Sequence, residues 1–472
     1  MMPKKENFSE WYPYILTRGD FIEYSEVSGC YILKPRAYKM WEIFQAWFND
    51  KISKLGVKNC YFPLFIPEKL IRKEAKHIAG FEPEVAWITV GGHTELKEKL
   101  AIRPTSETII YDAFSKWIRS WRNLPLKINQ WCSVVRWEFA HPIPFLRTRE
   151  FLWQEGHTAY ATPEEAEKET YEILDLYERA YSELFAVPVI KGRKTEKEKF
   201  AGADYTLSLE TFLPTGKAIQ CCTSHCLGQN FSKAFDIQFL DKTGTKQYVW
   251  QNSWGFTTRS IGIAIIFHSD DKGLILPPAI APEQIVIIPI FYGEKKEEII
   301  NKAKEIYAAL SKSFRVELDG REEYTPGWKF NEWELKGVPL RIEIGLKEIA
   351  ANEITVVRRD NGQKFSIALA KAKKEIKKIL KQMQKDLYAK AKANLKNAIK
   401  KVFNFNEFLE ALKNKKFILA PWCGQSDCEQ LVKDKSEAKC ITIPFEQEKL
   451  DALICFNCSR KAVCWTYWAK SV

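Results

Sequence analysis

Residues 130–160 read QWCSVVRWEFAHPIPFLRTREFLWQEGHTAY, and the rest of the chain is organised around this stretch. β-Branched and aromatic residues fill both ends, while Pro142 and Pro144 interrupt the middle, which predicts two strands joined by an irregular loop. Alternation along the first strand places Arg136 and Glu138 on one face and apolar side chains, including those of Trp137 and Phe139, on the other. Along the return strand it places four side chains on a common side: Phe151, Trp153, Glu155 and His157.

The charged face of this hairpin allows two interpretations. A lone Arg-x-Glu in a strand is usually a pair of solvated charges on an amphipathic hairpin. A floor of aromatic and charged side chains also suits a nucleotide. The segments that flank the hairpin decide between the two.

Composition limits the class of protein. With 472 residues, 46% of them hydrophobic and 28% charged, the chain is expected to be globular, soluble and built of about two to four domains. Its net charge of +12 favours a nucleic-acid partner, although a soluble basic enzyme would look similar. Neither a signal peptide nor a membrane-spanning stretch is evident, so we expect a cytoplasmic protein.

Three further segments stand in a fixed order around the hairpin. Residues 36–55 have the apolar spacing of a helix, with a strand ending at Pro63 after it. Gly91 and Gly92 mark a turn before the triplet Thr105-Ser106-Glu107, which alone predicts a helix start capped by Thr105. Residues 251–259, QNSWGFTTR, precede an apolar run with helical potential.

Taken together, these segments resemble the class II aminoacyl-tRNA synthetases. Arg136, Glu138, Arg147 and Phe151 match the family's motif 2. The helix and strand up to Pro63 are similar to motif 1, which in the family builds the dimer interface, and residues 251–259 are similar to motif 3. The family fold is an α+β domain around a mixed or antiparallel sheet, and its members use ATP with Mg²⁺.

Within that class, the chain resembles the prolyl-tRNA synthetases of the archaeal and eukaryotic form over almost its whole length. Free proline carries a cationic secondary amine, so its pocket needs a buried carboxylate and an acceptor hydroxyl, which Glu107 and Thr105 would supply. The proline ring is apolar and suits aromatic walls. The resemblance implies a proline pocket formed by Phe81, Thr105, Glu107, Arg136, Trp153, Glu155, His157, Phe200, His225 and Ser253.

The same resemblance implies an ATP site. Arg136 would hold the α-phosphate and Arg259 the terminal phosphate of a bent ATP, as the two catalytic residues. Cys221 and Cys222 stand where the family commonly has small residues, and cysteine is still compact. The residues implied at the ATP site are Arg136, Glu138, Arg147, Thr148, Phe151, Gln220, Thr223, Thr257 and Arg259.

The second half of the chain changes pattern after residue 280. Strands are predicted at 285–290, 314–318, 340–344 and, as the last, 354–359, with an amphipathic helix at 294–311, which indicates an α/β domain similar to the family's anticodon-binding domain. Guanines in an anticodon are best read by cations and a carboxylate. The candidates are Lys329, Glu332, Arg341 and Lys347.

Half of the twelve cysteines cluster at the end of the chain, after a lysine-rich helix predicted at 371–401. A CxxxxC and a distant CxxC suit a closed tetrahedral zinc site in a small α+β domain, with redox or unliganded thiols as the alternative. The expected ligands, which the family resemblance also names, are Cys423, Cys428, Cys455 and Cys458. The expected domains are residues 1–280, 281–385 and 386–472.

These observations predict a homodimeric prolyl-tRNA synthetase that makes prolyl-adenylate from L-proline and ATP and transfers the prolyl group to tRNA(Pro). The stretch between His157 and Arg259 is too short for an inserted editing domain, so hydrolysis of mischarged tRNA is not expected here. Two alternatives stay open. A threonyl-tRNA synthetase would need a zinc site in its central region, and a non-catalytic paralogue would only bind tRNA or partner proteins.

Overall fold

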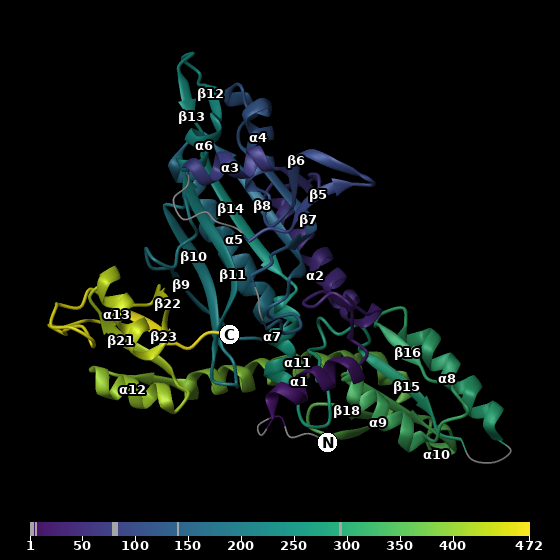
Figure 1. Ribbon diagram of the computed structural model, residues 1–472. Coiled ribbons are helices and arrows are strands. Elements are labelled where there is room, and N and C mark those ends of the chain that lie inside the picture. Colours follow the sequence, from purple (N-terminus) through teal and green to yellow (C-terminus); the bar gives the residue numbers. More distant parts are fainter. Residues whose placement is uncertain (1–3, 5–6, 78–83, 139–140, 292–294) are drawn as a thin grey trace.

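The computed structural model describes residue 4 and residues 7–77, 84–138, 141–291 and 295–472. It has three regions, with the N-terminal one in purple to teal, the middle one in green and the C-terminal one in yellow (Figure 1). None of the described helices is both long enough and apolar enough to cross a lipid bilayer.

An eleven-stranded sheet joins the N-terminal and C-terminal regions. Its order is β20-β21-β23-β22-β9-β10-β11-β14-β8-β7-β3, and it is antiparallel except where β3 meets β7 and β20 meets β21. The N-terminal part contains β3 (Lys58–Asn59), β7 (Leu126–Val135), β8 (Glu150–Tyr160), β9 (Ile190–Arg193), β10 (Tyr205–Phe212), β11 (Ala218–Gly228) and β14 (Trp250–Thr257). The predicted mixed, mainly antiparallel sheet is confirmed.

The predicted hairpin is β7 paired antiparallel with β8, from Val135 opposite Glu150 to Leu126 opposite Ala159. One part of the expectation was wrong. β7 ends at Val135, and Trp137 is 44% exposed instead of lying on an apolar face. The chain turns away because the Trp137 N–H donates to the carbonyl of Glu84, and the Arg149 guanidinium then covers the indole ring at 4.4 Å. Phe139 lies outside the described residues.

Two apolar cores flank the sheet of the N-terminal region. In the larger core, the predicted helix α2 (Pro35–Lys54) buries Trp41, Phe44, Phe48 and Ile52 beside α1 (Phe8–Arg18), α5 (Pro163–Glu183) and α7 (Arg259–His268). The strand expected up to Pro63 is only the two residues of β3. The smaller core joins α3 (Glu68–His77), α4 (Glu107–Trp117) and α6 (Asn230–Phe235).

The N-terminal region also contains three small sheets. The predicted turn at Gly91 and Gly92 is confirmed, because it connects β5 and β6, and Gly92 has φ of +60°, which favours glycine. The first sheet pairs β1 (Ile22–Tyr24) with β2 (Tyr31–Leu33), the second has β6 (Thr94–Ile102) between β4 (Phe65–Pro67) and β5 (Trp87–Gly91), and the third pairs β12 (Gln238–Leu240) with β13 (Lys246–Tyr248).

The middle region is an α/β unit, as predicted. Its sheet order is β16-β15-β17-β18-β19, with β15 parallel to β16 and β17 and the remaining pairs antiparallel. The expectation that the strand near residue 359 is the last was wrong, since β19 adds an edge strand. The elements are β15 (Ile285–Pro289), α8 (Lys296–Leu310), β16 (Val316–Leu318), α9 (Pro326–Lys336), β17 (Leu340–Ile344), α10 (Leu346–Ala351), β18 (Glu353–Arg358) and β19 (Lys364–Ala368).

A long helix, α11 (Ala372–Ala398), runs from the middle region to the C-terminal region (Figure 1). It buries the expected stripe of Ile376, Ile379, Leu380, Met383 and Leu387, and the expected boundary at residue 385 falls inside it. The C-terminal region follows with β20 (Ile399–Lys401), α12 (Phe405–Lys413), β21 (Phe417–Trp422), α13 (Ser426–Ser436), β22 (Lys439–Pro444) and β23 (Cys464–Ala469).

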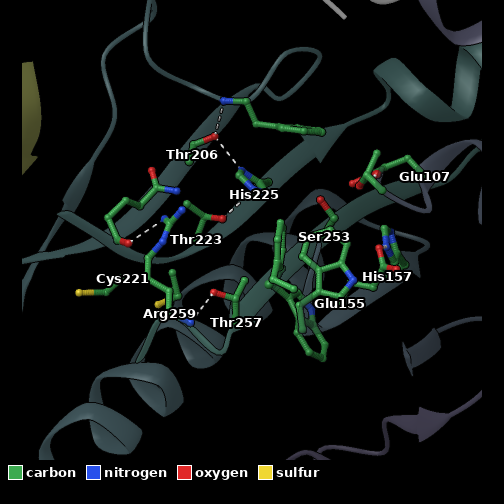
Figure 2. Close-up of a pocket in the computed structure, with 18 of the residues that line it drawn as sticks. Glu107, Glu155, His157, Thr206, Cys221, Thr223, His225, Ser253, Thr257 and Arg259 are labelled. Atoms are coloured by element: carbon green, nitrogen blue, oxygen red, sulfur yellow. Dashed lines mark hydrogen bonds and ion pairs between the residues drawn. The ribbon is translucent and has the colours of Figure 1, made fainter. Parts of the chain in front are cut away.

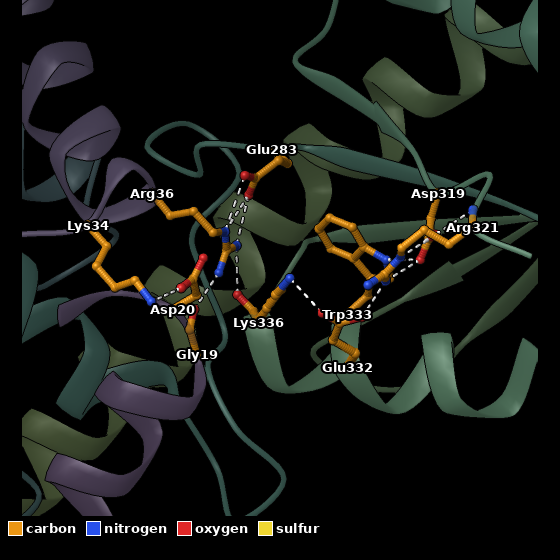
Figure 3. A network of polar contacts seen from close by, with 10 residues as sticks. All are labelled: Gly19, Asp20, Lys34, Arg36, Glu283, Asp319, Arg321, Glu332, Trp333 and Lys336. Atoms are coloured by element: carbon orange, nitrogen blue, oxygen red, sulfur yellow. Dashed lines mark hydrogen bonds and ion pairs between the residues drawn. The ribbon is translucent and has the colours of Figure 1, made fainter. Parts of the chain in front are cut away.

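A buried ion pair ties the N-terminal region to the middle region (Figure 3). The Arg36 guanidinium donates to both carboxylate oxygens of Glu283, with the shortest contact at 2.8 Å, and to the carbonyls of Gly19 and Lys336 at 2.7 and 2.9 Å. Arg359 makes a second link, to Asp270 at 2.7 Å. These contacts fix how the middle region sits against α1 and α2.

Candidate active site

One cavity of about 280 Å³ opens over the strands β8, β11 and β14 (Figure 2). Most of the residues expected from the sequence in the proline pocket and the ATP site line this cavity. From the expected proline pocket it is lined by Thr105, Glu107, Arg136, Trp153, Glu155, His157, Phe200, His225 and Ser253, and from the expected ATP site by Phe151, Gln220, Thr223, Thr257 and Arg259. The alternation predicted for β8 is the reason that Phe151, Trp153, Glu155 and His157 share it.

Four expected residues are not placed on this cavity. Phe81 lies outside the described residues. Glu138 and Arg147 are exposed and do not line the cavity. Thr148 is buried and lines a neighbouring pocket of about 190 Å³, which shares Phe151 with the first.

Six residues of the lining were not predicted. Alternation along β14, which carries Ser253 and Thr257, would have found Gly255. The segment between β9 and β10 brings Glu198 to the cavity, and Thr206 lies in β10 itself, opposite His225 in the paired strand β11. The six are Glu198, Thr206, Cys221, Cys222, Trp254 and Gly255.

At one end of the cavity, Thr105 and Glu107 contact each other directly. The Thr105 hydroxyl donates to Oε2 of Glu107, and the two side chains are 7% and 4% exposed. The expected capping role of Thr105 was wrong: Ser106 is the N-cap of α4 and makes no side-chain cap. The Thr105 hydroxyl bonds to the carboxylate of Glu107 instead and orients it.

Beside this end lies a buried polar network centred on Glu155. Its carboxylate accepts from Ser106, from Gln130 at 3.0 Å and from Nε2 of His157 at 3.0 Å. Burial alone would raise the pKa of Glu155, but the contacts with His157, Ser106 and Gln130 outweigh it and lower the pKa. Tyr111 holds the other ring nitrogen of His157 at 3.0 Å. Glu155 is therefore a fixed negative charge in the wall of the cavity.

His225 is held between two hydroxyls, as the dashed lines in Figure 2 show. Thr206 contacts its Nδ1 and Thr223 its Nε2, both at 2.9 Å. Desolvation, with a smaller effect from His157, lowers the pKa of His225 to about 3. Its imidazole is therefore neutral at physiological pH, and the Phe200 ring packs on it with centroids 4.6 Å apart. A neutral ring adds no charge that would repel a cationic amine.

Arg136 is oriented by the loop before α4 and by the aromatic floor. Its Nε donates to the carbonyl of Pro104 at 3.0 Å, and its guanidinium lies 5.6 Å from the Phe151 ring and 5.4 Å from the Trp153 ring. This geometry combines cation–π attraction with a hydrogen bond. The Nη groups remain available to an anion in the cavity.

Arg259 stands at the start of α7, where β14 ends. Its Nε donates to the carbonyl of Leu146 and its Nη1 to the carbonyl of Gln220, each at 3.1 Å. Desolvation lowers the pKa of Arg259, and the nearby charge of Arg136 lowers it further, against a raising effect of Tyr181. Both guanidinium groups line the same cavity, so an anion that contacts both would be stabilised by each of them.

The four terminal cysteines meet as predicted. Their sulfur atoms lie within 4.8 Å of one another, with Cys428 3.7 Å from Cys455 and 3.8 Å from Cys458, and Cys458 3.7 Å from Cys423. Zn–S bonds of about 2.3 Å in a tetrahedron would set the sulfurs about 3.8 Å apart. The cluster therefore fits a zinc ion in both ligand type and spacing.

The four anticodon candidates differ in exposure and in their contacts. Lys329 is 1% exposed and donates to the carbonyl of Asp319 at 3.2 Å. Glu332 contacts Arg321 and Lys336 (Figure 3), and Arg341 donates to Glu343 at 2.8 Å. Lys347, in the first turn of α10, is exposed.

Comparisons with known proteins agree with this geometry. Residues 88–267 match the family model described as the tRNA synthetase class II core domain (G, H, P, S and T). Residues 284–379 match the anticodon binding domain, and residues 405–471 match the prolyl-tRNA synthetase C-terminal domain. Each of the three regions of the fold thus matches a domain family named for tRNA synthetases or for anticodon binding.

Curated relatives extend the likeness over the whole chain. A protein named "Proline--tRNA ligase, cytoplasmic" from Arabidopsis thaliana is 49% identical over 99% of this chain and 90% of its own length. Proteins named "Proline--tRNA ligase" are 46% identical in Encephalitozoon cuniculi and 47% identical in Alkaliphilus oremlandii, covering 98% and 97% of their lengths. The chain therefore belongs to the proline–tRNA ligase family of class II aminoacyl-tRNA synthetases.

Proposed function

We propose that this chain is a proline–tRNA ligase that activates L-proline with ATP and transfers the prolyl group from the adenylate to the 3′ end of tRNA(Pro). In the first step the proline carboxylate attacks the α-phosphate of ATP and pyrophosphate leaves. In the second, a hydroxyl of the terminal ribose takes the prolyl group and AMP leaves. Neither step needs a covalent enzyme intermediate.

One observation carries this proposal: a single cavity joins the Thr105–Glu107 pair to the two guanidinium groups of Arg136 and Arg259. The carboxylate end is complementary to a cationic secondary amine, and the guanidinium end to phosphates. Such a site works by alignment and by neutralising developing charge, which can supply most of the barrier reduction. No residue is assigned as a general base.

The proline ring would lie among Trp153, Phe200 and His225, with its amine toward Glu107 and the Ser253 hydroxyl nearby. Ser253 is 3% exposed, and its hydroxyl has no hydrogen-bond partner among the described residues, so a ligand can satisfy it. Glu155 and His157 would support this end from below. Phe81, expected in the same pocket, stays a prediction.

Arg136 would contact the proline carboxylate and the α-phosphate together, and Arg259 the outer phosphates, with Thr257 beside it. Phe151 would stack on the adenine, and Glu138, Arg147 and Thr148 would complete the ATP site once ATP is bound. Bound Mg²⁺ would neutralise phosphate charge near Gln220 and Thr223, whose oxygens are the hard ligands it prefers.

For the remainder of the molecule we propose binding of the tRNA(Pro) anticodon by the middle region, homodimer formation, and a cytoplasmic location. Lys347 and Arg341 are the better-placed anticodon candidates, because Lys329 is buried against Asp319. In the C-terminal region the four-cysteine cluster would hold a structural zinc ion, since four sulfur ligands leave no position open for chemistry.

Exchange of labelled pyrophosphate into ATP, measured with each of the twenty amino acids separately, tests the proposal. We expect exchange with proline well above that with any other amino acid. Exchange with threonine alone would identify a threonyl-tRNA synthetase instead. Exchange with none, in a protein that still binds tRNA, would identify a non-catalytic paralogue.

A further inference from the structure

The C-terminal region is built into the sheet of the N-terminal region at one specific place. β22 pairs with β9, with Ile443 opposite Arg193 and Pro444 opposite Gly192. Directly after β9 comes the segment 194–206, which brings Glu198, Phe200 and Thr206 to the lining of the cavity. This segment therefore connects the strand that pairs with the C-terminal region to the lining of the cavity.

A buried hydrogen bond joins the segment to the helix that carries a cluster cysteine. The Thr195 hydroxyl donates to Oε1 of Glu429 at 3.1 Å, and the two residues are 4% and 3% exposed. Glu429 follows Cys428 directly in the first turn of α13. At the neighbouring position, Lys194 donates to the carbonyl of Ile441 in β22 at 2.8 Å.

The same threonine shapes the segment itself. Its hydroxyl accepts from the N–H of Glu198 at 3.3 Å, and its carbonyl accepts from the N–H of Lys199 at 2.9 Å, which closes a tight turn. Farther along, the N–H of Phe200 donates to the Thr206 hydroxyl at 2.9 Å, and that hydroxyl contacts His225 (Figure 2). A continuous set of hydrogen bonds and chain neighbours thus runs from α13 to the cavity.

We propose that Thr195 and Glu429 are positioning residues through which the four-cysteine cluster, when it holds zinc, keeps the segment 194–206 in the shape that lines the cavity. Zinc would fix Cys428 and with it the first turn of α13, so the carboxylate of Glu429 stays aimed at Thr195. Phe200 follows this turn and bonds to Thr206, so a change in the turn would alter the end of the cavity that we propose binds proline. This inference rests on the proposed function for its kinetic consequences only.

Two pairs of variants separate positioning from general structure. Thr195→Val keeps the size of the side chain and removes the hydroxyl, while Thr195→Ser keeps the hydroxyl. Glu429→Met removes the acceptor, while Glu429→Gln keeps an oxygen that can accept. Glu437→Gln, at an exposed position just past α13 where the side chain pairs with Lys470, is the matched control.

In pyrophosphate exchange, Thr195→Val and Glu429→Met are expected to raise KM for proline about 3- to 10-fold, the range that a single buried hydrogen bond gives, with KM for ATP unchanged. Thr195→Ser, Glu429→Gln and the control should keep the wild-type values. Equal changes in both KM values, or none, would overturn the proposal. A wild-type protein that gives no exchange with proline would instead overturn the proposed function.

Amide hydrogen exchange gives a readout independent of activity. In the full-length protein, removal of zinc with a chelator is expected to speed exchange across 194–206 while α5 stays protected, and Thr195→Val with zinc bound should speed it to a similar degree. Zinc removal should then add little in Thr195→Val, because the two changes break one connection. Unchanged exchange in 194–206 of the wild type after zinc loss contradicts the proposal, and this arm decides it if Thr195→Val does not fold.

Discussion

The Thr105 hydroxyl donates to the carboxylate of Glu107 at the closed end of the cavity, and both side chains are almost completely buried. A buried carboxylate is costly unless it is paired or hydrogen bonded. Here one hydroxyl satisfies one oxygen, and among the described residues the carboxylate has no cationic partner. A bound ligand with a cationic amine would supply that partner.

Replacement of Glu107 by glutamine is therefore expected to weaken proline recognition selectively. The change keeps the size and removes the charge, so kcat/KM for proline should fall about 10- to 100-fold, the range for a hydrogen bond to a charged group. KM for ATP should stay unchanged in pyrophosphate exchange. Glu164→Gln, at an exposed position in α5, is the control. If Glu107→Gln had the same kcat/KM for proline as this control, Glu107 would not take part in proline recognition.

Arg259 should not tolerate lysine. Its guanidinium donates to two carbonyls, of Leu146 and Gln220, and still presents N–H groups to the cavity, which a single ammonium cannot do. We expect Arg259→Lys to lower kcat of exchange about 100-fold or more, as loss of one preorganised donor does. Arg122→Lys, at an exposed position, should be silent. A wild-type kcat in Arg259→Lys would show that the arginine only supports the fold.

Much of the site could be predicted from local pattern. Period-2 alternation placed four side chains of β8 on one face, and the 3.6-residue period gave the buried faces of α2 and α11. The spacing of the cysteines predicted the cluster, because each of the two short cysteine motifs supplies two sulfur ligands to one metal site. In each case the signal lies within about thirty residues.

What could not be predicted depends on contacts between distant segments. Trp137 leaves its expected face because the carbonyl of Glu84 accepts a hydrogen bond from its backbone N–H, and the buried Nζ of Lys329 donates to the carbonyl of Asp319, which lies just after β16. The β9–β22 pairing joins residues about 250 apart in sequence, and neither strand differs in composition from an ordinary edge strand. Propensity and period carry no information about such partners.

His225 should stay neutral down to strongly acidic pH. Its folded pKa of about 3 lies below the ordinary value of 6.5, so the unfolded chain binds more protons between these values. The stabilising contribution of neutral His225 is complete above about pH 6.5 and is lost progressively as the pH falls toward 3. An NMR titration of histidine Cε1 signals, assigned with His225→Gln, should show no protonation of His225 above about pH 5. A midpoint near 6.5 would contradict the buried, doubly hydrogen-bonded ring.

The cysteine cluster should hold about one zinc ion per chain in protein purified without chelators. Cys428→Ser is expected to lose that metal and to lower the midpoint of thermal unfolding, because the binding free energy of a structural zinc contributes to folding. Metal content measured by mass spectrometry checks this. Cys30→Ser, outside the cluster, should keep its zinc. Full zinc content in Cys428→Ser would place the ion elsewhere.

Arg36 should carry much of the connection between the N-terminal and middle regions. Its side chain is 8% exposed and that of Glu283 20%, so Arg36→Met leaves a carboxylate mostly buried without its cation. Loss of one partner of a buried pair costs about 3 kcal/mol, whereas Arg72→Met removes a pair with Glu68 in which the arginine side chain is 72% exposed, and should cost less than about 1 kcal/mol. Urea unfolding of both variants measures the difference.

The same variant separates the two steps of the proposed reaction. Arg36 lies outside the cavity lining, so pyrophosphate exchange with proline should change little in Arg36→Met. Charging of tRNA(Pro) requires the middle region and the cavity to engage one tRNA together, and it should fall more than exchange does. Glu283→Gln should repeat the effect, and the double variant should lose little beyond either single one, because both act on one contact. Equal losses in exchange and charging would show that the pair supports the cavity itself and not the placement of the middle region.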